Sequence, residues 1–300
     1  MTYGRGAVLV VAAAALWSLM GLFIRQIGVA DTWAVLLWRS LGSLPVLVAL
    51  VAWRSGGRPL AALRGAGGSG VAGALCLVAA FAGAVYALQA TSIANAVFLF
   101  SASPFFAAIL GRLVLGEAVR RATWVAIAIA GAGMAVMVRD GLAGGALGGN
   151  LAALLSAAGF AAFTVTLRRG GRRDTLPTVV LGAALAAVVS AAMLAATGGS
   201  ALVPPGDILW AVAAGAVLLG FGMALYTAGS RAIPAADLTL LSMVEVLLAP
   251  VWVWLLMGET ASPATFAGGA IILGAVAFNA VTGARAGLAA RAARRPGETG

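Results

Sequence analysis

The longest uncharged stretch of the chain places the strongest limit on its fold. Between Arg64 and Arg112 lie 47 consecutive residues without a charge. An apolar helix of about 20 residues crosses a lipid bilayer. This stretch is therefore long enough for two crossings, joined by a turn near residues 90–95. A second uncharged run extends from Gly6 to Ile24. The chain is expected to lie in a membrane.

The composition excludes a water-soluble globular fold. Hydrophobic residues make up 62% of the chain and charged residues 9%, whereas soluble domains are about half apolar and about a quarter charged. A soluble globule of this length cannot bury so much apolar surface. We predict an all-α integral membrane protein with ten transmembrane helices, at 6–24, 33–53, 69–90, 95–115, 122–138, 149–167, 177–197, 208–229, 237–257 and 264–283.

The arginines predict the topology. With ten spans both termini lie on one side of the membrane, and the loops on that side carry fifteen of the nineteen arginines, against two, Arg25 and Arg139, on the other side. Because cytoplasmic loops hold the excess of basic residues, we expect a multi-pass protein of the bacterial inner membrane with both termini cytoplasmic. The net charge of +10 then reflects topology and contact with membrane lipid, and not nucleic-acid binding. We interpret the first span as a retained helix and not a signal peptide, since it is long for that role and nine spans follow.

The two halves of the chain repeat the same order of features. The segment from Tyr86 to Ile93 recurs from Tyr226 to 233, and each copy is followed by an apolar helix that ends in Gly-Glu, at Glu117 and at Glu259. Five spans in each half is an odd number, so the second half should insert upside down, as in many transporters. We predict a first repeat over 1–140, an inverted second repeat over 141–285 and an Arg-rich cytoplasmic tail over 286–300.

These features resemble the EamA-type transporters of the drug/metabolite transporter superfamily over essentially the whole chain. The resemblance is carried by the helix of Trp17, by Leu-Leu-Trp-Arg ending at Arg39, by Ser-Ala-Ser-Pro ending at Pro104, and by the two Gly-Glu motifs together with Glu245. Within that superfamily the chain is most similar to the YddG-type exporters of aromatic amino acids and methyl viologen. One departure is that Val246 follows Glu245 where the family often has proline.

Enzymatic and cofactor chemistry find little support in the residues. The chain has no histidine and one cysteine, Cys76, so metal sites, disulfides and catalytic triads are not expected. The glycine-rich stretch at 65–70 lacks the Gly-Lys-Ser/Thr of a phosphate-binding loop. We expect no cofactor and no enzymatic activity, and transport must then draw on gradients.

Two ionisable residues within the spans are candidate substrate contacts. Glu245 falls near the middle of its span, where a charge is costly and usually faces a cavity or a partner. It could couple transport to protons or bind a substrate ammonium, or it could be a structural residue that is neutral or paired with Arg39. Arg39 could bind a substrate carboxylate, or it could snorkel or bond a neighbouring helix.

Aromatic and hydroxyl residues complete the predicted site. Trp17 and Phe160 occupy related positions in the two halves, as do Tyr86 and Tyr226, and such a set could line a pocket or simply pack helices. Hydroxyls that could serve the pocket, or bond their own helices, are those of Ser18, Ser101, Ser103 and Ser242. Two prolines that could form hinges or static kinks are Pro104 and Pro250.

The sequence therefore predicts a secondary transporter that exports small organic metabolites by alternating access. Hydrophobic or aromatic amino acids and flat organic cations suit the aromatic residues. The alternatives are a nucleotide-sugar or phosphate-ester carrier, which would need several basic groups in the pocket, and a membrane receptor or scaffold without transport. The expected partners are a small-molecule substrate and lipid, with the protein a monomer or a weak homodimer.

Overall fold

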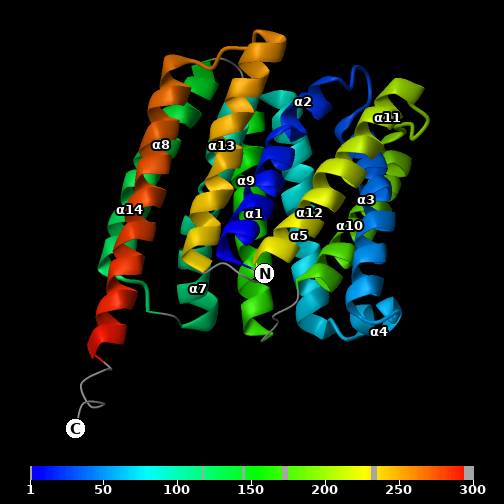
Figure 1. Ribbon diagram of the computed structural model, residues 1–300. Coiled ribbons are helices and arrows are strands. Elements are labelled where there is room, and N and C mark those ends of the chain that lie inside the picture. The colour runs from blue at the N-terminus through cyan, green and yellow to red at the C-terminus, as the bar shows by residue number, and fades with distance from the viewer. Residues whose placement is uncertain (1, 117, 144–145, 171–174, 231–234, 294–300) are drawn as a thin grey trace.

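The computed structural model describes residues 2–116, 118–143, 146–170, 175–230 and 235–293, and within these ranges every regular element is a helix (Figure 1). The helices are α1 (Tyr3–Ser18), α2 (Met20–Arg25), α3 (Thr32–Arg54), α4 (Pro59–Arg64), α5 (Gly67–Ala90), α6 (Ile93–Phe100), α7 (Ser103–Leu115), α8 (Arg121–Ala143), α9 (Leu147–Arg169), α10 (Leu176–Thr197), α11 (Pro205–Ala213), the π-helix η1 (Ala214–Phe221), α12 (Gly222–Ser230), α13 (Ala235–Met257) and α14 (Pro263–Ala293).

Each predicted span coincides with one of these helices or with a consecutive run of them. Seven of the described segments are long and apolar enough to cross a bilayer: 4–25, 32–54, 67–90, 93–115, 147–169, 176–197 and 205–229. The other three spans correspond to shorter apolar stretches in α8, α13 and α14, at 121–137, 244–257 and 263–279. The all-helical membrane class is confirmed, while the count of ten crossings stays a prediction. Residues 294–300 of the predicted tail lie outside the described ranges.

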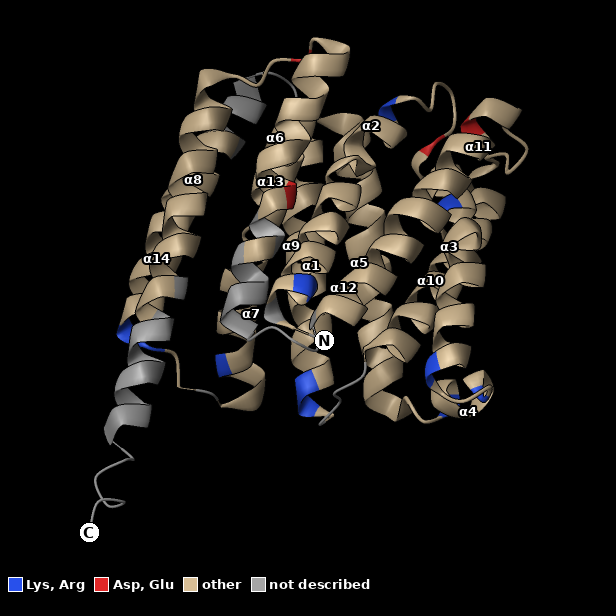
Figure 2. Ribbon diagram, viewed as in Figure 1, with Lys and Arg blue, Asp and Glu red and all other residues tan. Residues whose placement is uncertain are grey.

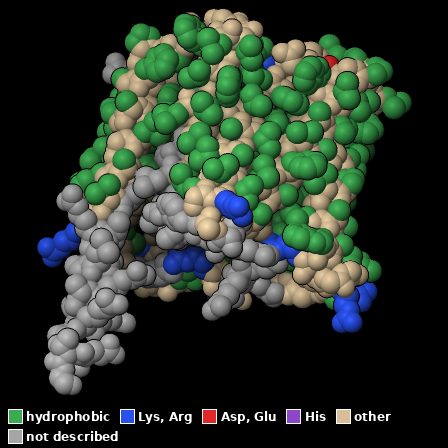
Figure 3. Space-filling view, viewed as in Figure 1, with side chains coloured by type: hydrophobic (Ala, Val, Ile, Leu, Met, Phe, Trp, Pro, Cys, Tyr) green, Lys and Arg blue, Asp and Glu red, His purple; other side chains and the backbone are tan. Residues whose placement is uncertain are grey.

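The seven long segments are apolar around their whole circumference. In their most apolar windows only 33–56% of the residues are buried against other parts of the chain. The rest of each window faces outward although it is also apolar, and Figure 3 shows apolar side chains spread over most of the visible face. Helices with this pattern need lipid around them, because water would not solvate so large an apolar surface.

Most of the charged residues that the structure describes lie near one end or the other of the helices (Figure 2). Figure 2 shows arginines gathered mainly at the end where α3 meets α4 and where α9 ends. At the opposite end, which we call the Arg-poor end, Arg25 is the last residue of α2 and Asp207 lies in the first turn of α11. The assignment of the arginine-rich end to the cytoplasm remains a prediction.

Helix pairing brings the two halves of the chain together. α5 packs along α9, α1 lies between α12 and α13, α3 packs on α10 and on η1, and α8 packs on α14. Glycines permit the closest approach between α5 and α9. A Cβ on Gly83 would lie 2.7 Å from the carbonyl oxygen of Ala152, and one on Gly159 would lie 2.9 Å from the backbone nitrogen of Ala80.

Three of the membrane segments are not continuous α-helices. The first is interrupted at Leu19 between α1 and α2, and the fourth at residues 101–102 between α6 and α7. The segment that corresponds to the predicted span 208–229 contains η1, a stretch of π-helix that separates α11 from α12. Such interruptions in membrane helices are tolerated where neighbouring protein satisfies the freed backbone groups, and π-helical turns often lie at functional sites.

Candidate functional site

Trp17 and Tyr226 are in direct contact near the middle of the bundle. Their ring centroids are 5.3 Å apart at an interplanar angle of 40°. The indole nitrogen of Trp17 is buried and has no acceptor among the described residues. It lies so close to Gly222 that a Cβ there would collide with it. The aromatic pair therefore offers a tilted pair of rings and one unused N–H donor.

Glu245 lies on the face of α13 that turns towards α1. Seven residues further along, the indole nitrogen of Trp252 donates a 2.9 Å hydrogen bond to Oγ of Ser18 on α1. Seven residues correspond to about two helical turns, so Glu245 shares that face about 10 Å along the helix. Its half-buried carboxyl makes no hydrogen bond or ion pair with a described residue. The structure thus leaves a carboxyl group inside the bundle, facing the helix that carries Trp17.

Arg39 is 4% exposed, and its guanidinium lies 4.8 Å from the ring centroid of Phe81 on α5. Its Nε and Nη2 atoms are buried without an acceptor. The Arg39–Glu245 ion pair, one of the alternatives considered for Glu245, is not present among the described residues, where the one ion pair joins Arg25 and Glu259. Arg39 does not snorkel to the surface, and its cation–π contact offsets only part of the cost of burying a charge.

The other repeat-related aromatics do not form the same arrangement. Tyr86 is 45% exposed and lies against Gly148 at the start of α9, whereas Phe160 is 48% exposed and its ring packs 5.7 Å from that of Phe163. Of the four predicted pocket aromatics, Trp17 and Tyr226 are the two with a ring contact to each other among the described residues. A pocket shared by all four aromatics stays a prediction.

The serines and prolines differ in their local structure. Ser101 donates a 2.6 Å hydrogen bond to the carbonyl oxygen of Phe98 in its own helix. Ser103 is the first residue of α7 and Pro104 the second, where a missing backbone N–H breaks no helical bond. Pro250 instead lies inside the continuous helix α13. The side chain of Ser242 lies outside the described part of the chain.

At the Arg-poor end, an ion pair joins residues that the sequence alone did not select. Nη2 of Arg25 lies 3.3 Å from Oε2 of Glu259 and donates a 2.8 Å hydrogen bond to the carbonyl oxygen of Thr91. The carboxylate also accepts a 3.1 Å hydrogen bond from the backbone N–H of Ile93. The recurrence of Gly-Glu in both halves was the available signal, but it gave no partner for Glu259.

A buried polar network lies directly behind this ion pair. Oγ1 of Thr91 donates to Oδ1 of Asn150 at 3.0 Å, the amide of Asn95 bonds both of these residues, and Oγ1 of Thr265 donates to Oδ1 of Asn95 at 3.4 Å. The side-chain amide of Asn150 donates to the carbonyl oxygen of Met137 at 3.3 Å. The network ties α6, α8, α9 and α14 to the end of α5.

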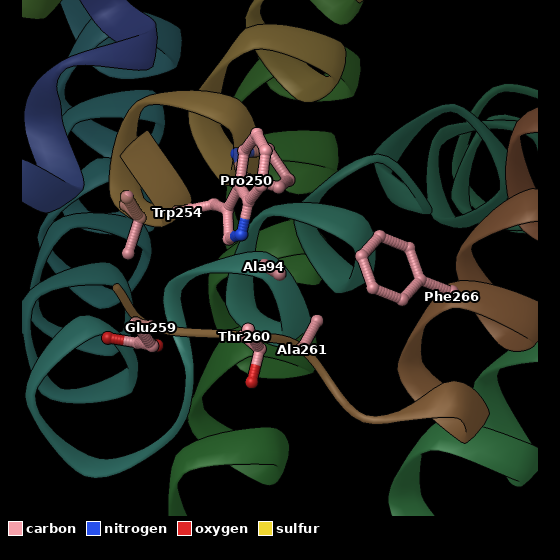
Figure 4. Close-up of a pocket in the computed structure, with 8 residues that line it drawn as sticks. Ala94, Pro250, Trp254, Glu259, Thr260, Ala261 and Phe266 are labelled. Carbon is pink, nitrogen blue, oxygen red and sulfur yellow. The ribbon is translucent and has the colours of Figure 1, made fainter. Parts of the chain in front are cut away.

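A small cavity opens between α13 and α14 beside the same ion pair (Figure 4). Its volume is about 170 Å³, and it is lined by Ala94, Pro250, Val253, Trp254, Glu259, Thr260, Ala261 and Phe266. Of the predicted site residues, Pro250 alone lines this cavity. Trp254 and Phe266 are more than half exposed, so its apolar wall continues into the outer surface of the bundle.

No cluster of three or more metal-ligating side chains occurs in the described ranges. Among the groups inside the bundle, the guanidinium of Arg39 lies beside the ring of Phe81, and Glu245 faces the helix that carries Trp17. Charged groups among apolar and aromatic side chains suit the binding of a small organic molecule. Together with the apolar helical fold, it defines a multi-pass membrane protein of the small-molecule transporter class.

The comparisons with known proteins agree with that class. The EamA-like transporter family matches twice, over residues 4–139 and 147–281. The chain belongs to the EamA-like transporter family, with one copy of the family sequence in each half. A solved structure described only as "Crystal structure of protein" is 22% identical, with a TM-score of 0.65 over 92% of this chain and 97% of that one, and it supports the fold alone. No match was found among curated proteins.

Proposed function

We propose that the chain is a secondary transporter that exports small organic metabolites by alternating access, with hydrophobic or aromatic amino acids as the first substrate class and flat organic cations as the second. The observation that carries the proposal is the carboxyl of Glu245, which has no hydrogen-bond partner among the described residues and faces α1, the helix that carries Trp17 of the Trp17–Tyr226 pair. A carboxylate beside aromatic rings is suited to an ammonium or a flat organic cation.

The relative depth of these groups supports a common site. Gly222 approaches Trp17, and Gly229 approaches Gly6 and Val10, so α12 runs antiparallel to α1. α13 follows α12 after a short connection and runs back alongside α1. Glu245 therefore lies about two helical turns from the level of Ser18, towards the start of α1. Long side chains on a helix, such as that of Trp17, also lean towards the start of their helix.

The helix pairing supports alternating access between inverted repeats. The counterpart of a helix is the helix at the same place in the other repeat. α1 packs on α12 and α13. Its counterpart α9 packs on α5, the counterpart of α12, and on α6 and α7, which together are the counterpart of α13. α3 packs on η1, as its counterpart α10 packs on α5, and the remaining pairs α3–α10 and α8–α14 each join a helix to its own counterpart. Two similar halves that exchange equivalent contacts can face inward and outward in turn.

Arg39 keeps an anion carrier as the second candidate. A buried guanidinium with two unpartnered nitrogens can bind a carboxylate or a phosphate ester in bidentate fashion. An amino acid would use it for one carboxylate, whereas a nucleotide sugar or phosphate ester would need further basic groups. Among the described residues, Arg39 is the buried arginine, which favours the amino acid.

The test is uptake of radiolabelled phenylalanine and of methyl viologen into proteoliposomes, with and without a pH gradient. Glu245→Gln removes the charge, and Glu245→Asp is the matched control that keeps a carboxyl. We expect saturable uptake by the wild type, a pH response that Glu245→Asp retains, and loss of that response in Glu245→Gln.

The aromatic pair provides an independent readout. Trp17→Ala should raise KM by about tenfold, since one stacking contact with a desolvated ligand contributes about 1–2 kcal/mol, whereas Trp17→Phe should retain most of the affinity. If no amino acid or organic cation is transported while phosphate esters are, the second candidate replaces the first. Saturable binding of phenylalanine, methyl viologen or a phosphate ester without uptake would indicate a receptor.

A further inference from the structure

The ion pair at the Arg-poor end joins the two halves of the chain. Arg25 ends the first membrane segment of the first half, while Glu259 lies in the connection between α13 and α14 of the second half. Thr91, in the turn between α5 and α6, and Ile93, at the start of α6, bond the same two side chains through their backbone. One glutamate therefore holds three connections that meet at this end: the end of α2, the α5–α6 turn and the α13–α14 connection.

The position of Ile93 makes this contact specific to one helix terminus. Ile93 is the first residue of α6, so its backbone N–H has no partner within the helix. The carboxylate of Glu259 satisfies that N–H, and its negative charge favourably faces the positive end of the helix dipole. Ser92 satisfies a second such donor, at Asn95. Removal of the carboxylate would leave α6 without one of its two N-terminal acceptors.

The ion pair is partly exposed to solvent. Arg25 and Glu259 are 28% and 26% exposed at the side chain, so solvent screens the pair in part and no fully buried charge is created when it separates. The neighbouring Thr91–Asn150–Asn95 network is buried and satisfied. Opening at this end should therefore break the ion pair and leave the network intact.

We propose that Arg25 and Glu259 form a latch that holds the Arg-poor end closed in the described conformation, and that the latch must break before a substrate can pass through that end. The inference rests on the proposed transport cycle, in which each end opens in turn. It adds the residues that control one of those openings, which neither the family match nor the fold identifies.

The latch can be tested by labelling of a buried thiol, without any substrate. Val97 lies one turn beyond Ile93 in α6 and is 7% exposed, so a cysteine there should react slowly while the end is closed. The reporter is Val97→Cys in a Cys76→Ala background, in nanodiscs, with a charged maleimide as the probe. When opening and closing are fast, the labelling rate follows the population of the open form.

We expect Glu259→Gln to raise the labelling rate of the reporter by about tenfold, which corresponds to about 1.4 kcal/mol. Arg25→Gln should give a rise in the same direction, because it removes the ion pair and the hydrogen bond to the carbonyl oxygen of Thr91. Asp31→Asn is the matched control, because Asp31 is a carboxylate at the same end that caps α3 and not α6, and asparagine caps helices as well as aspartate does. It should leave the rate unchanged.

An unchanged rate in both single variants would overturn the latch, as would an equal rise in Asp31→Asn. If Glu259→Gln does not fold, the unaltered pair can be tested in about 1 M salt, which screens partly exposed charges and should raise the rate several-fold; no rise there would also overturn it. The labelling requires no transport, so a latch that responds while the proteoliposomes stay inactive would refute the proposed function alone.

Discussion

Replacement of Arg39 by methionine should stabilise the protein while it impairs transport. The guanidinium is 4% exposed, two of its nitrogens have no acceptor among the described residues, and its one favourable electrostatic contact is with the ring of Phe81. Methionine keeps an unbranched apolar side chain of similar reach, so the packing of the stem is largely retained. The charge and its unsatisfied donors are removed.

The magnitude follows from these groups. Each buried donor without a partner destabilises the fold by about 1–3 kcal/mol, so removal of two should stabilise it by about 2–6 kcal/mol. Loss of the cation–π contact offsets this gain by up to about 2 kcal/mol. With the full cation–π contribution subtracted, we expect the free energy of unfolding to rise by up to about 4 kcal/mol. For a chain of this size about 1 kcal/mol shifts Tm by about 2 °C, which gives a rise of several degrees.

Thermal unfolding in detergent, followed by tryptophan fluorescence, measures the change. Arg64→Met is the matched control, because Arg64 is exposed at the end of α4 and surface substitutions usually change stability by less than about 0.5 kcal/mol. If Arg39→Met lowered Tm relative to wild type, the guanidinium would be stabilising the fold and the argument for an unsatisfied charge would fail. A more stable variant with unchanged uptake would remove Arg39 from the substrate site.

Three further predictions test the packing. Gly215→Ala should lower stability by about 1–3 kcal/mol, because its Cβ would collide with backbone atoms of α3. Gly131→Ala should raise stability by about 0.5–1 kcal/mol, because a Cβ there meets open space. Thermal unfolding measures both changes. Asp207→Ala should lower stability by about 2 kcal/mol, since three backbone N–H groups lose their acceptor, and hydrogen exchange should speed up at those amides. Trp252→Phe should slow transport without unfolding, because it deletes the bond to Ser18 that fixes the face of α13, and uptake assays with fluorescence-detected size exclusion check both parts.

The helices could be predicted from the sequence because lipid imposes a minimum length on each apolar run. The predicted span 177–197, for example, agrees with α10 (Leu176–Thr197) to one residue. The recurrence of Gly-Glu motifs likewise predicted the duplication that the two family matches show. These features depend on composition and local order, which a single sequence records directly.

The site contacts depend on packing between distant segments, and the sequence predicted them less well. Arg25 and Glu259 are 234 residues apart, and nothing near either residue indicates its partner. Proline gave a similar difficulty: the same residue type follows a helix break at Pro104 and lies within a continuous helix at Pro250. Its local effect is set by the neighbouring helices and not by proline alone.

The π-helix η1 distinguishes the second half of the chain from the first just before Tyr226. An α-helix rotates by about 100° per residue, and the wider turns of Ala214–Phe221 alter that angular phase just before Tyr226. α5 contains no such segment before Tyr86. Tyr226 contacts Trp17, while Tyr86 lies against Gly148. The duplicated sequence thus has two unequal halves, and the half with η1 is the one in which the aromatic pair forms.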